Sequence, residues 1–264
     1  MPEQIRSRVI FRAASIGLVA LALLVFATPL PFSAIHKNAP GTAIAYWLSE
    51  SGGKYGTAII LVVTCLFFTR FAGGEKRAKF WVFLGTLAKL LLLIGLLAYA
   101  NEHGIKHALK CPRPSHEYVT ARSDGKLGIT EFYDADESAR GALLQGVYDQ
   151  QADHFSHIDP RILHHWVEET GYSFPSGHSF NGFLLAFILS FCLRFSRSHT
   201  ARKYYLVPIV WGVLVGASRV AVGAHTAWDV SLGAAMGVGI AFLLMHFDLL
   251  RKNILHRDHE KPVP

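Results

Sequence analysis

The stretch SFPSGHSF, residues 173–180, lies where a polar segment of the sequence gives way to a long apolar one. Pro175, Ser176 and Gly177 favour a turn, and the titratable ring of His178 follows them directly. A turn, a glycine and a histidine are an odd entry into a helix of membrane-like composition.

The composition around this boundary is that of a membrane protein. Of the 264 residues, 51% are hydrophobic and 17% are charged, whereas a soluble domain carries about 25% charged residues. The apolar residues collect in runs near the roughly 20 residues that a bilayer-spanning helix needs. The sequence therefore predicts an all-α integral membrane protein with one domain over residues 1–264.

Six of these apolar runs are predicted to be transmembrane helices. A cleaved signal peptide is the alternative for the first run, because the small residues of ATPLPFSA follow its apolar core, but we favour a retained helix. A short helix on the surface is expected at Gly41–Ser49. The six predicted spans are Ile10–Pro29, Tyr55–Thr69, Phe80–Tyr99, Phe180–Phe195, Tyr205–Val222 and Trp228–Phe247.

The net charge of +7 follows this topology and does not indicate a nucleic-acid partner. Every second connection between the predicted spans is basic, which is the positive-inside pattern, so both termini are expected to be cytoplasmic. The cations of these connections are Arg6, Arg8 and Arg12; Arg70, Lys76, Arg77 and Lys79; Arg194, Arg197, Arg202 and Lys203; and Arg251, Lys252, Arg257 and Lys261.

The polar segment at residues 107–173 falls on the outer side, between the third and fourth predicted spans. Acidic residues outnumber basic ones in it, and it is too long for a simple connector. We expect a small, mostly helical cap over the outer membrane face. Several histidines of this segment match no metal-ligand spacing and are expected to be surface residues: His107, His116, His154, His157, His164 and His165.

Three polar clusters share the outer face in this topology. They are KHALKCPRP at residues 106–114, PSGH at residues 175–178, and SRVAVGAHTAWD at residues 218–229. Each cluster lies at an end of a predicted span, and the topology that places them together depends on cations in other connections. Segments that are distant in the sequence are therefore expected to converge at one membrane boundary.

The cations and the glycine of these clusters suit a phosphate. The planar guanidinium groups of Arg113 and Arg219 can each bond two phosphate oxygens, and Lys106 adds a third positive charge. Ser176 and Gly177 come just before a helix, so their backbone N–H groups are expected to point at the same anion. Gly177 also lets the backbone approach a ligand closely. The sequence predicts a phosphate site that contains no metal and no cofactor.

The histidines supply the chemistry. Asp229 follows His225 by four residues and can hold one ring nitrogen protonated, which leaves the other nitrogen free to attack. His178, from a different helix, can donate a proton to the leaving oxygen. Attack by His225 would form a phosphohistidine that water later hydrolyses.

Together the clusters resemble the signature of the type-2 phosphatidic acid phosphatase (PAP2) superfamily. The resemblance implies that His225, Asp229 and His178 are catalytic, with His225 as the nucleophile. It implies that the phosphate is bound by Lys106, Arg113, Ser176, Gly177 and Arg219. The matching residues are Lys106 with Arg113-Pro114, Pro175-Ser176-Gly177-His178, and Ser218-Arg219 with His225 and Asp229.

The layout of spans, the outer insertion and the stretch HHWVEETGYSFPSGH are similar to the bacterial phosphatidylglycerophosphatase branch of this superfamily. That similarity implies an enzyme of the bacterial inner membrane with a periplasmic active site and no obligate protein partner. Its implied substrates are phosphorylated membrane lipids, including phosphatidylglycerol phosphate, undecaprenyl diphosphate and phosphatidate.

Two other classes of function stay open on the residues alone. A transporter or scramblase for anionic lipids is compatible with six spans and a basic outer site, although few polar residues lie near the membrane midplane. A haloperoxidase-like role is suggested by vanadate-binding relatives that share the clusters. Lys89, inside the third predicted span, is expected to snorkel or to form an internal hydrogen bond, and Glu169 is a candidate to orient His178 or a headgroup.

Overall fold

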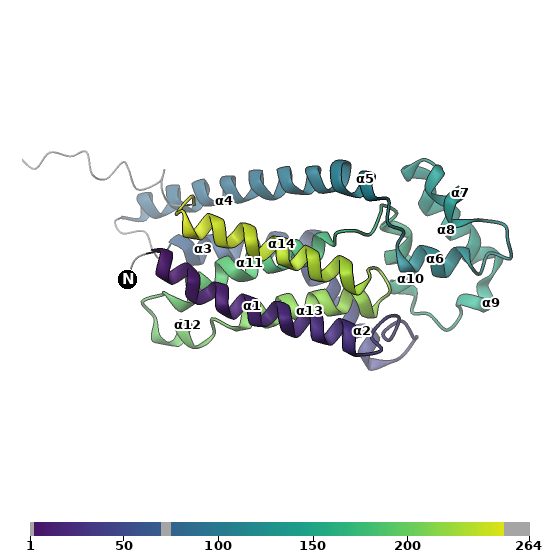
Figure 1. Cartoon of the computed structure of the whole chain (residues 1–264), viewed down its shortest axis with the longest axis horizontal. Helices are drawn as coiled ribbons and strands as arrows, with labels where there is room; N and C mark the ends of the chain where they lie inside the picture. The colour runs from purple at the N-terminus through teal and green to yellow at the C-terminus, as the bar shows by residue number, and fades with distance from the viewer. Residues whose placement is uncertain (1–2, 70–74, 251–264) are drawn as a thin grey trace, which may run out of the picture.

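A computed structural model describes residues 3–69 and 75–250, and that part of the chain is helical almost throughout (Figure 1). The predicted all-α class is therefore confirmed. The long helices are α1 (Glu3–Ala27), α2 (Pro40–Gly52), α3 (Lys54–Phe68), α4 (Lys76–Tyr99), α11 (Gly177–Arg194), α13 (Val207–Ala221) and α14 (Ala227–His246). Arg70, Arg251, Lys252, Arg257 and Lys261, on which part of the predicted topology depends, lie outside the described residues.

The described residues contain four helical segments that are long and apolar enough to cross a membrane, or five with the bent pair α2 and α3. These two helices meet at an angle of 58°. Helix α13 is apolar but has 15 residues, which is short for a span. The predicted count of six spans is not confirmed. The four long segments are Arg6–Ala27, Lys76–Leu109, Gly177–Arg194 and Ala227–His246.

Helix α4 runs further than the third predicted span. It continues through a π-helical segment, η2 (Ala100–Lys106), into the short helix α5 (His107–Leu109). The backbone turns at Lys110, which has the left-handed φ of 48°, shortly before Pro112. Lys106 therefore lies in a helical extension of the third span and not in the connection that follows it.

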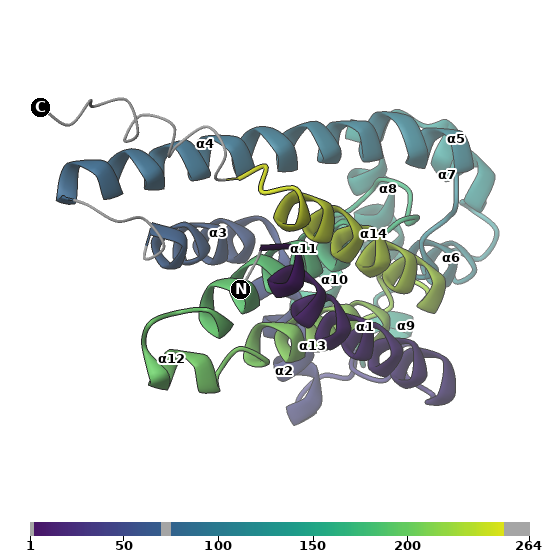
Figure 2. The same ribbon diagram turned by 60° about the vertical axis from the view of Figure 1, so that its left-hand side comes forward.

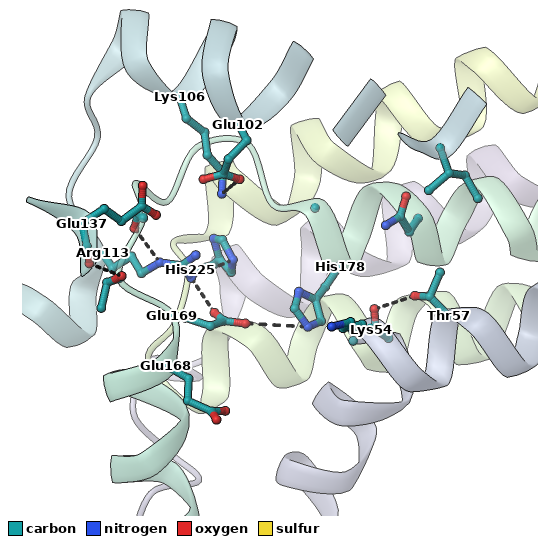
Figure 3. Close-up of a pocket in the computed structure, with 17 residues that line it drawn as sticks. Lys54, Thr57, Glu102, Lys106, Arg113, Glu137, Glu168, Glu169, His178 and His225 are labelled. Atoms are coloured by element: carbon teal, nitrogen blue, oxygen red, sulfur yellow. Dashed lines mark hydrogen bonds and ion pairs between the residues drawn. The ribbon is translucent and has the colours of Figure 1, made fainter. Parts of the chain in front are cut away.

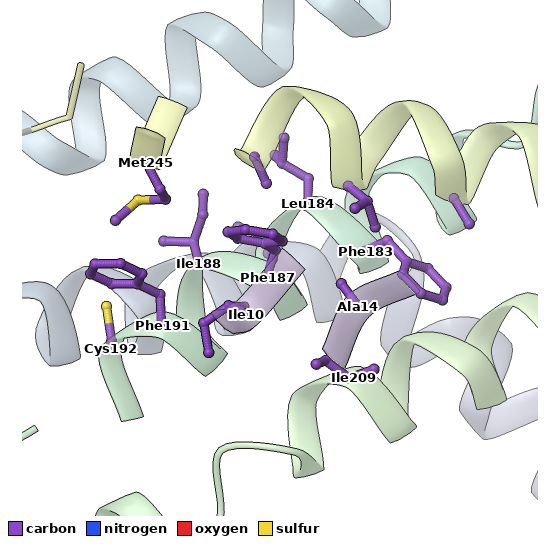
Figure 4. Packing of buried hydrophobic residues seen from close by; sticks show 14 of the residues in the cluster. Ile10, Ala14, Phe183, Leu184, Phe187, Ile188, Phe191, Cys192, Ile209 and Met245 are labelled. Carbon is purple, nitrogen blue, oxygen red and sulfur yellow. The ribbon is translucent and has the colours of Figure 1, made fainter. Parts of the chain in front are cut away.

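Helix α11 forms the centre of the bundle, because its side chains are apolar on every face. In its most apolar stretch 72% of the residues are buried, against 17% for the peripheral helix α4. Figure 4 shows Phe183, Phe187 and Phe191 of α11 in one cluster with Ile10 of α1 and Met245 of α14. The helix that begins at the PSGH cluster is thus held by packing along most of its length.

Two glycines let α14 approach the first turns of α11. A Cβ atom on Gly233 would lie 2.5 Å from the carbonyl oxygen of Ser176, and one on Gly237 would lie 2.3 Å from that of Phe180. At this crossing the backbone N–H of Ser176 donates to the carbonyl oxygen of Asp229 at 3.0 Å. The close packing fixes the PSGH cluster against the start of α14.

Helix α2 corrects the expectation of a surface helix at Gly41–Ser49. Thr42, Ala45 and Ser49 are buried, and the side chain of Trp211 on α13 donates to Ser51 at 2.9 Å. The helix therefore packs into the bundle against α13.

The segment at residues 107–173 folds mostly into short helices, as predicted, and Figures 1 and 2 show them gathered at one end of the bundle. Their side chains Phe132, Leu144, Ile162 and Trp166 belong to a second hydrophobic core, which also includes residues of the α1–α2 connection, α2 and the end of α13. The indole N–H of Trp166 donates to the carbonyl oxygen of Val222 at 2.8 Å, which ties this cap to the end of α13. The cap helices are α6 (Pro114–Thr120), α7 (Ile129–Asp134), α8 (Glu137–Gln150), α9 (Ala152–Phe155) and α10 (Pro160–Glu168).

Two of the six cap histidines are not surface residues, which corrects the sequence-based expectation. His116 is fully buried, and His165 is 7% exposed. His116 is in hydrogen-bond contact with the hydroxyl of Tyr133 at 2.7 Å. His165 shares the buried face of α10 with Ile162 and Trp166, because residues three and four apart lie on one side of a helix.

Lys89 forms an internal hydrogen bond, one of the two outcomes predicted for it. Its amino group donates to the backbone carbonyl oxygens of Leu250, at 3.1 Å, and Leu249, at 3.4 Å. The lysine therefore binds carbonyl groups in the turn that follows α14.

Candidate active site

The three polar clusters of the sequence meet at one cavity of about 480 Å³ between the end of the bundle and the cap (Figure 3). The cavity is lined by members of each cluster: Lys106 and Arg113, Gly177 and His178, and His225. Arg219 and Asp229 lie behind this lining and contact residues of the cavity wall. Members of the three clusters that lie up to 123 positions apart in the chain, Lys106 and Asp229, are thereby brought to one site.

Lys106 and Arg113 enter the cavity from opposite ends of the connection between η2 and α6. The ammonium group of Lys106 is 2.8 Å from the carboxylate of Glu102, one helical turn earlier. Pro114 occupies the first turn of α6, where its missing N–H is no loss, so Arg113 sits at the helix start. The backbone N–H of Arg113 donates to the hydroxyl of Tyr133 at 3.0 Å, which anchors the arginine to the cap.

His178 stands in the first turn of α11. The side chain of Ser176 caps this helix by accepting from the backbone N–H of Ser179 at 3.4 Å. The backbone N–H of Ser176 donates to the carbonyl oxygen of Asp229, and of this pair of residues Gly177 lines the cavity. The expectation that both N–H groups point at the anion is therefore not met for Ser176.

His225 lies in the turn between α13 and α14. Its Nδ1 is 3.5 Å from a carboxylate oxygen of Asp229, and its Nε2 is 3.3 Å from the guanidinium group of Arg113. The same carboxylate accepts from the backbone N–H of Thr226 at 2.7 Å, which fixes it at the start of α14. Burial, reinforced by the charges of Arg113 and Arg219, holds the pKa of His225 well below its ordinary value. The ring is therefore neutral at neutral pH.

Glu169 lies at the centre of the site. One of its oxygens accepts from Arg113 at 2.7 Å and also from Arg219. The other oxygen is 3.8 Å from Nε2 of His178 and 3.5 Å from Nε2 of His165. Burial works against the charged carboxylate, but Arg219 and Arg113 outweigh it and hold the pKa of Glu169 well below its ordinary value. The two arginines therefore hold an anion between them, beside both catalytic candidates.

Arg219 is completely buried and is held from behind by two further side chains. It donates to the hydroxyl of Ser49 at 2.7 Å and contacts Nε2 of His165 at 2.6 Å. These contacts join α2, α10 and α13 behind the cavity. The guanidinium group is thereby fixed in orientation.

Several residues of the site were missed or undervalued in the sequence. The spacing of Glu102 and Lys106, four apart on a helix, could have revealed their ion pair, and the amphipathic pattern of α10 could have revealed His165. No local pattern marks Ser49 or Lys54, because tertiary packing alone brings them here. Within residues 3–69 and 75–250, no three His, Cys, Asp or Glu side chains are grouped so that they could hold a metal ion.

Comparison with known proteins identifies the family of the chain. Residues 86–252 match the PAP2 superfamily, and the chain belongs to that superfamily. It is therefore a multi-pass membrane protein of a phosphatase family.

Among its relatives are phosphatidylglycerophosphatases B. The chain is 30% identical over 217 residues to that of Haemophilus influenzae, an alignment that covers 80% of this chain and 85% of the relative. It is 28% identical over 184 residues to that of Escherichia coli, covering 69% and 66%. It is 34% identical over 103 residues to that of Bacillus subtilis, covering 33% and 50%. These similarities confirm the resemblance found in the sequence.

Proposed function

We propose that this protein is a lipid phosphatase that removes the terminal phosphate of phosphatidylglycerol phosphate, undecaprenyl diphosphate or both, and also acts on phosphatidate-like lipids. The observation that carries the proposal is the pair Arg113 and Arg219, which share one carboxylate oxygen of Glu169. A phosphate oxygen is an equivalent acceptor for these guanidinium groups. Lys106 and Gly177 line the same cavity and supply further donors, and Ser176 caps α11 directly before Gly177.

The reaction proceeds in two steps. Nε2 of His225 forms a bond to phosphorus while Asp229 holds the proton on Nδ1. The bond between phosphorus and the lipid oxygen breaks, and that oxygen takes a proton from His178. Water, deprotonated by His178, then attacks the phosphohistidine, which releases inorganic phosphate and restores His225. In this mechanism the side chains of His225, Asp229 and His178 perform every step, so the mechanism requires no metal or cofactor.

A second, smaller cavity supports a lipid as the substrate. It has a volume of about 150 Å³ and shares Glu102, Lys106, Gly177 and Asn181 with the main cavity. Its other walls are largely apolar and come from α4, η2, α11 and α14, with Leu97, Ile105, Phe180 and Met236 among them. An acyl or prenyl chain can lie against these side chains while the headgroup occupies the polar cavity.

The cap and the polar cavity lie at the same end of the bundle. We place this end on the periplasmic side of the bacterial inner membrane, with both termini in the cytoplasm, because the basic connections lie at the other end of the predicted spans. In this arrangement residues 107–173 form a periplasmic cap within a single phosphatase domain of residues 1–264.

Phosphate release by the purified protein from a panel of defined lipids tests the proposal. We expect His225→Ala to abolish turnover and His178→Ala to lower it by about 10²- to 10⁴-fold. His164→Ala is the matched control, because that histidine is exposed on the cap. Normal phosphate release by His225→Ala would show that another group is the nucleophile.

The same protein in vesicles tests the transporter alternative. Lipid flipping that persists after both histidines are replaced, with no phosphate release from the wild-type protein, would favour a scramblase over a phosphatase.

A further inference from the structure

Lys54 is a cavity-lining cation that no sequence cluster contains. It is the first residue of α3, directly after the break that separates α3 from α2. Lys106 and Arg113, the other cations that line the cavity, are each paired with a glutamate. Lys54 forms no ion pair with any residue that the structure describes. Its ammonium group lies over the ring of Tyr55, 5.9 Å from the ring centre, but no carboxylate of the described residues neutralises its charge, which is therefore available to an anionic ligand.

Lys54 follows Gly53, and the backbone at Gly53 passes close to His178. A Cβ atom on Gly53 would lie 3.2 Å from Nε2 of His178, so the break between α2 and α3 closely approaches the catalytic candidate. In Figure 3, Lys54 follows His178 on the side away from Glu169 and His225. Cations thus lie on both sides of His178, with Arg113 on one side and Lys54 on the other.

The direction of the proposed reaction predicts which part of the substrate lies on the Lys54 side of His178. In phosphoryl transfer the attacking and leaving atoms lie roughly in line on opposite sides of phosphorus. If His225 attacks and His178 protonates the leaving oxygen, the rest of the lipid headgroup extends past His178. Lys54 lies in that direction, where a headgroup that retains a second phosphate would place its negative charge.

We propose that Lys54 binds the phosphate that stays on the lipid, and that it thereby favours substrates with two phosphates over lipids with one. This inference rests on the proposed function. The proposed role of Lys54 applies both to a diphosphate and to two phosphates joined through glycerol. In either headgroup, the part that leaves the reacting phosphorus still carries a negatively charged phosphate. Lys54 is a specificity-determining residue in this account, since the reacting phosphate is bound by Arg113, Arg219 and Lys106.

Steady-state kinetics of Lys54→Met test this assignment. The substrates are phosphatidylglycerol phosphate, undecaprenyl diphosphate and phosphatidate, each in mixed micelles. We expect the ratio of kcat/KM for each two-phosphate lipid to kcat/KM for phosphatidate to fall by about 10- to 100-fold, as for a lost hydrogen bond between charged groups. Lys54→Arg keeps the charge and should restore most of the ratio. Lys126→Met is the control, because Lys126 contacts Gln150 on the cap.

The outcomes separate the inference from the proposed function. A Lys54→Met protein that loses activity equally on all three lipids, or keeps the wild-type ratio for both two-phosphate lipids, would overturn the role of Lys54. A fall for one of the two lipids would assign the subsite to that headgroup. Wild-type protein that releases phosphate from none of the lipids would overturn the proposed function itself.

Discussion

Glu169 already occupies the anion site that the proposed substrate must enter. Its carboxylate is held by Arg113 and Arg219, which are 5% and 0% exposed. A phosphate group needs the same guanidinium donors. In the proposed function, binding of substrate is therefore an exchange of one anion for another, in which Glu169 must move or share its arginines when the headgroup arrives.

The first prediction follows from this exchange. Glu169→Gln removes the negative charge and leaves two buried guanidinium groups uncompensated, which destabilises the fold by up to about 3–5 kcal/mol. We expect a lower Tm in phosphate-free buffer, and we expect added phosphate or vanadate to raise the Tm of the variant more than that of the wild type. The control is Glu168→Gln, because that neighbouring carboxylate is 64% exposed. If added phosphate raised the Tm of Glu169→Gln and the Tm of the wild type by the same amount, the exchange of anions would be contradicted.

The second prediction concerns pH and His116. Burial, together with the charge of Arg113, lowers the pKa of His116 to about 3, whereas its value in the unfolded chain is about 6.5. Between these values the unfolded state binds a proton that the folded state does not bind. The free energy of unfolding should therefore fall as the pH drops below about 6.5, by up to about 1.4 kcal/mol per pH unit.

Thermal melts followed by tryptophan fluorescence between neutral pH and about pH 5 measure this effect. His116→Asn should be less stable at neutral pH but should show a shallower loss of Tm on acidification. His154→Asn, at an exposed position of the cap, should keep the wild-type slope. A His116→Asn protein with the full wild-type slope would show that other groups cause the acid sensitivity.

At the scale of elements, the crossing of α11 and α14 positions the two catalytic candidates. His178 belongs to the first turn of α11, and the Asp229 that supports His225 belongs to the first turn of α14. The glycines of α14 allow the two backbones to approach closely. The distance between the histidines therefore depends on backbone packing at this crossing.

The third prediction tests that packing with one methyl group. Gly237→Ala places a Cβ atom 2.3 Å from the carbonyl oxygen of Phe180, so the helices must separate. We expect a lower Tm and a lower kcat. The matched control is Gly239→Ala on the same helix. Apart from its chain neighbours and the nearby backbone of its own helix, no atom lies within 4 Å of the added Cβ, and alanine favours the helix by up to about 1 kcal/mol. Two variants with equal Tm and kcat would contradict the account.

Elements with strong local signals were predictable from the sequence. The apolar runs located α1, α4, α11 and α14, although α4 continues through a π-helical segment that carries no clear sequence signal. The sequence also singled out Arg113, His178, Arg219 and His225, because their motifs are local and the topology placed them on one face. Their convergence at one cavity is now visible, while their roles in the reaction remain predictions.

Features set by tertiary packing could not be predicted. The buried face of α2 carries Ser49 to Arg219, and the bend after it brings Lys54 to the cavity. The local sequence around Ser49 and Lys54 does not distinguish these two positions from residues on an ordinary exposed helix face. Glu169 was visible as a charge near the PSGH cluster, but its place between two arginines depends on the cap, which no periodic pattern describes.

At the scale of the whole molecule, the account requires the cap and the cavity to lie on the periplasmic side. The fourth prediction places single cysteines at Gln145 on α8 and at Thr200 on α12 (His199–Lys203), both exposed positions, in a protein whose Cys111 is replaced by serine. In intact spheroplasts, a membrane-impermeant maleimide should label Gln145→Cys and should label Thr200→Cys only after lysis. The reverse pattern would contradict the orientation.

The cap also links the site to the rest of the molecule. Arg140 of α8 donates to the carbonyl oxygens of Tyr133, at 2.7 Å, and Thr170, at 3.3 Å. Thr170 follows Glu169 directly, and the Tyr133 hydroxyl accepts from the backbone of Arg113. The cap therefore holds both partners of the central ion pair, which ties the anion site to the integrity of residues 107–173.

The central claim is that separate segments of the chain converge to hold one phosphate against His225. The most direct test is to quench the protein during turnover of a ³²P-labelled lipid and to map the labelled peptide. The account predicts an acid-labile, alkali-stable label on His225 that is absent from His225→Ala. A label on another residue, or full turnover with no labelled protein under rapid quench, would contradict it.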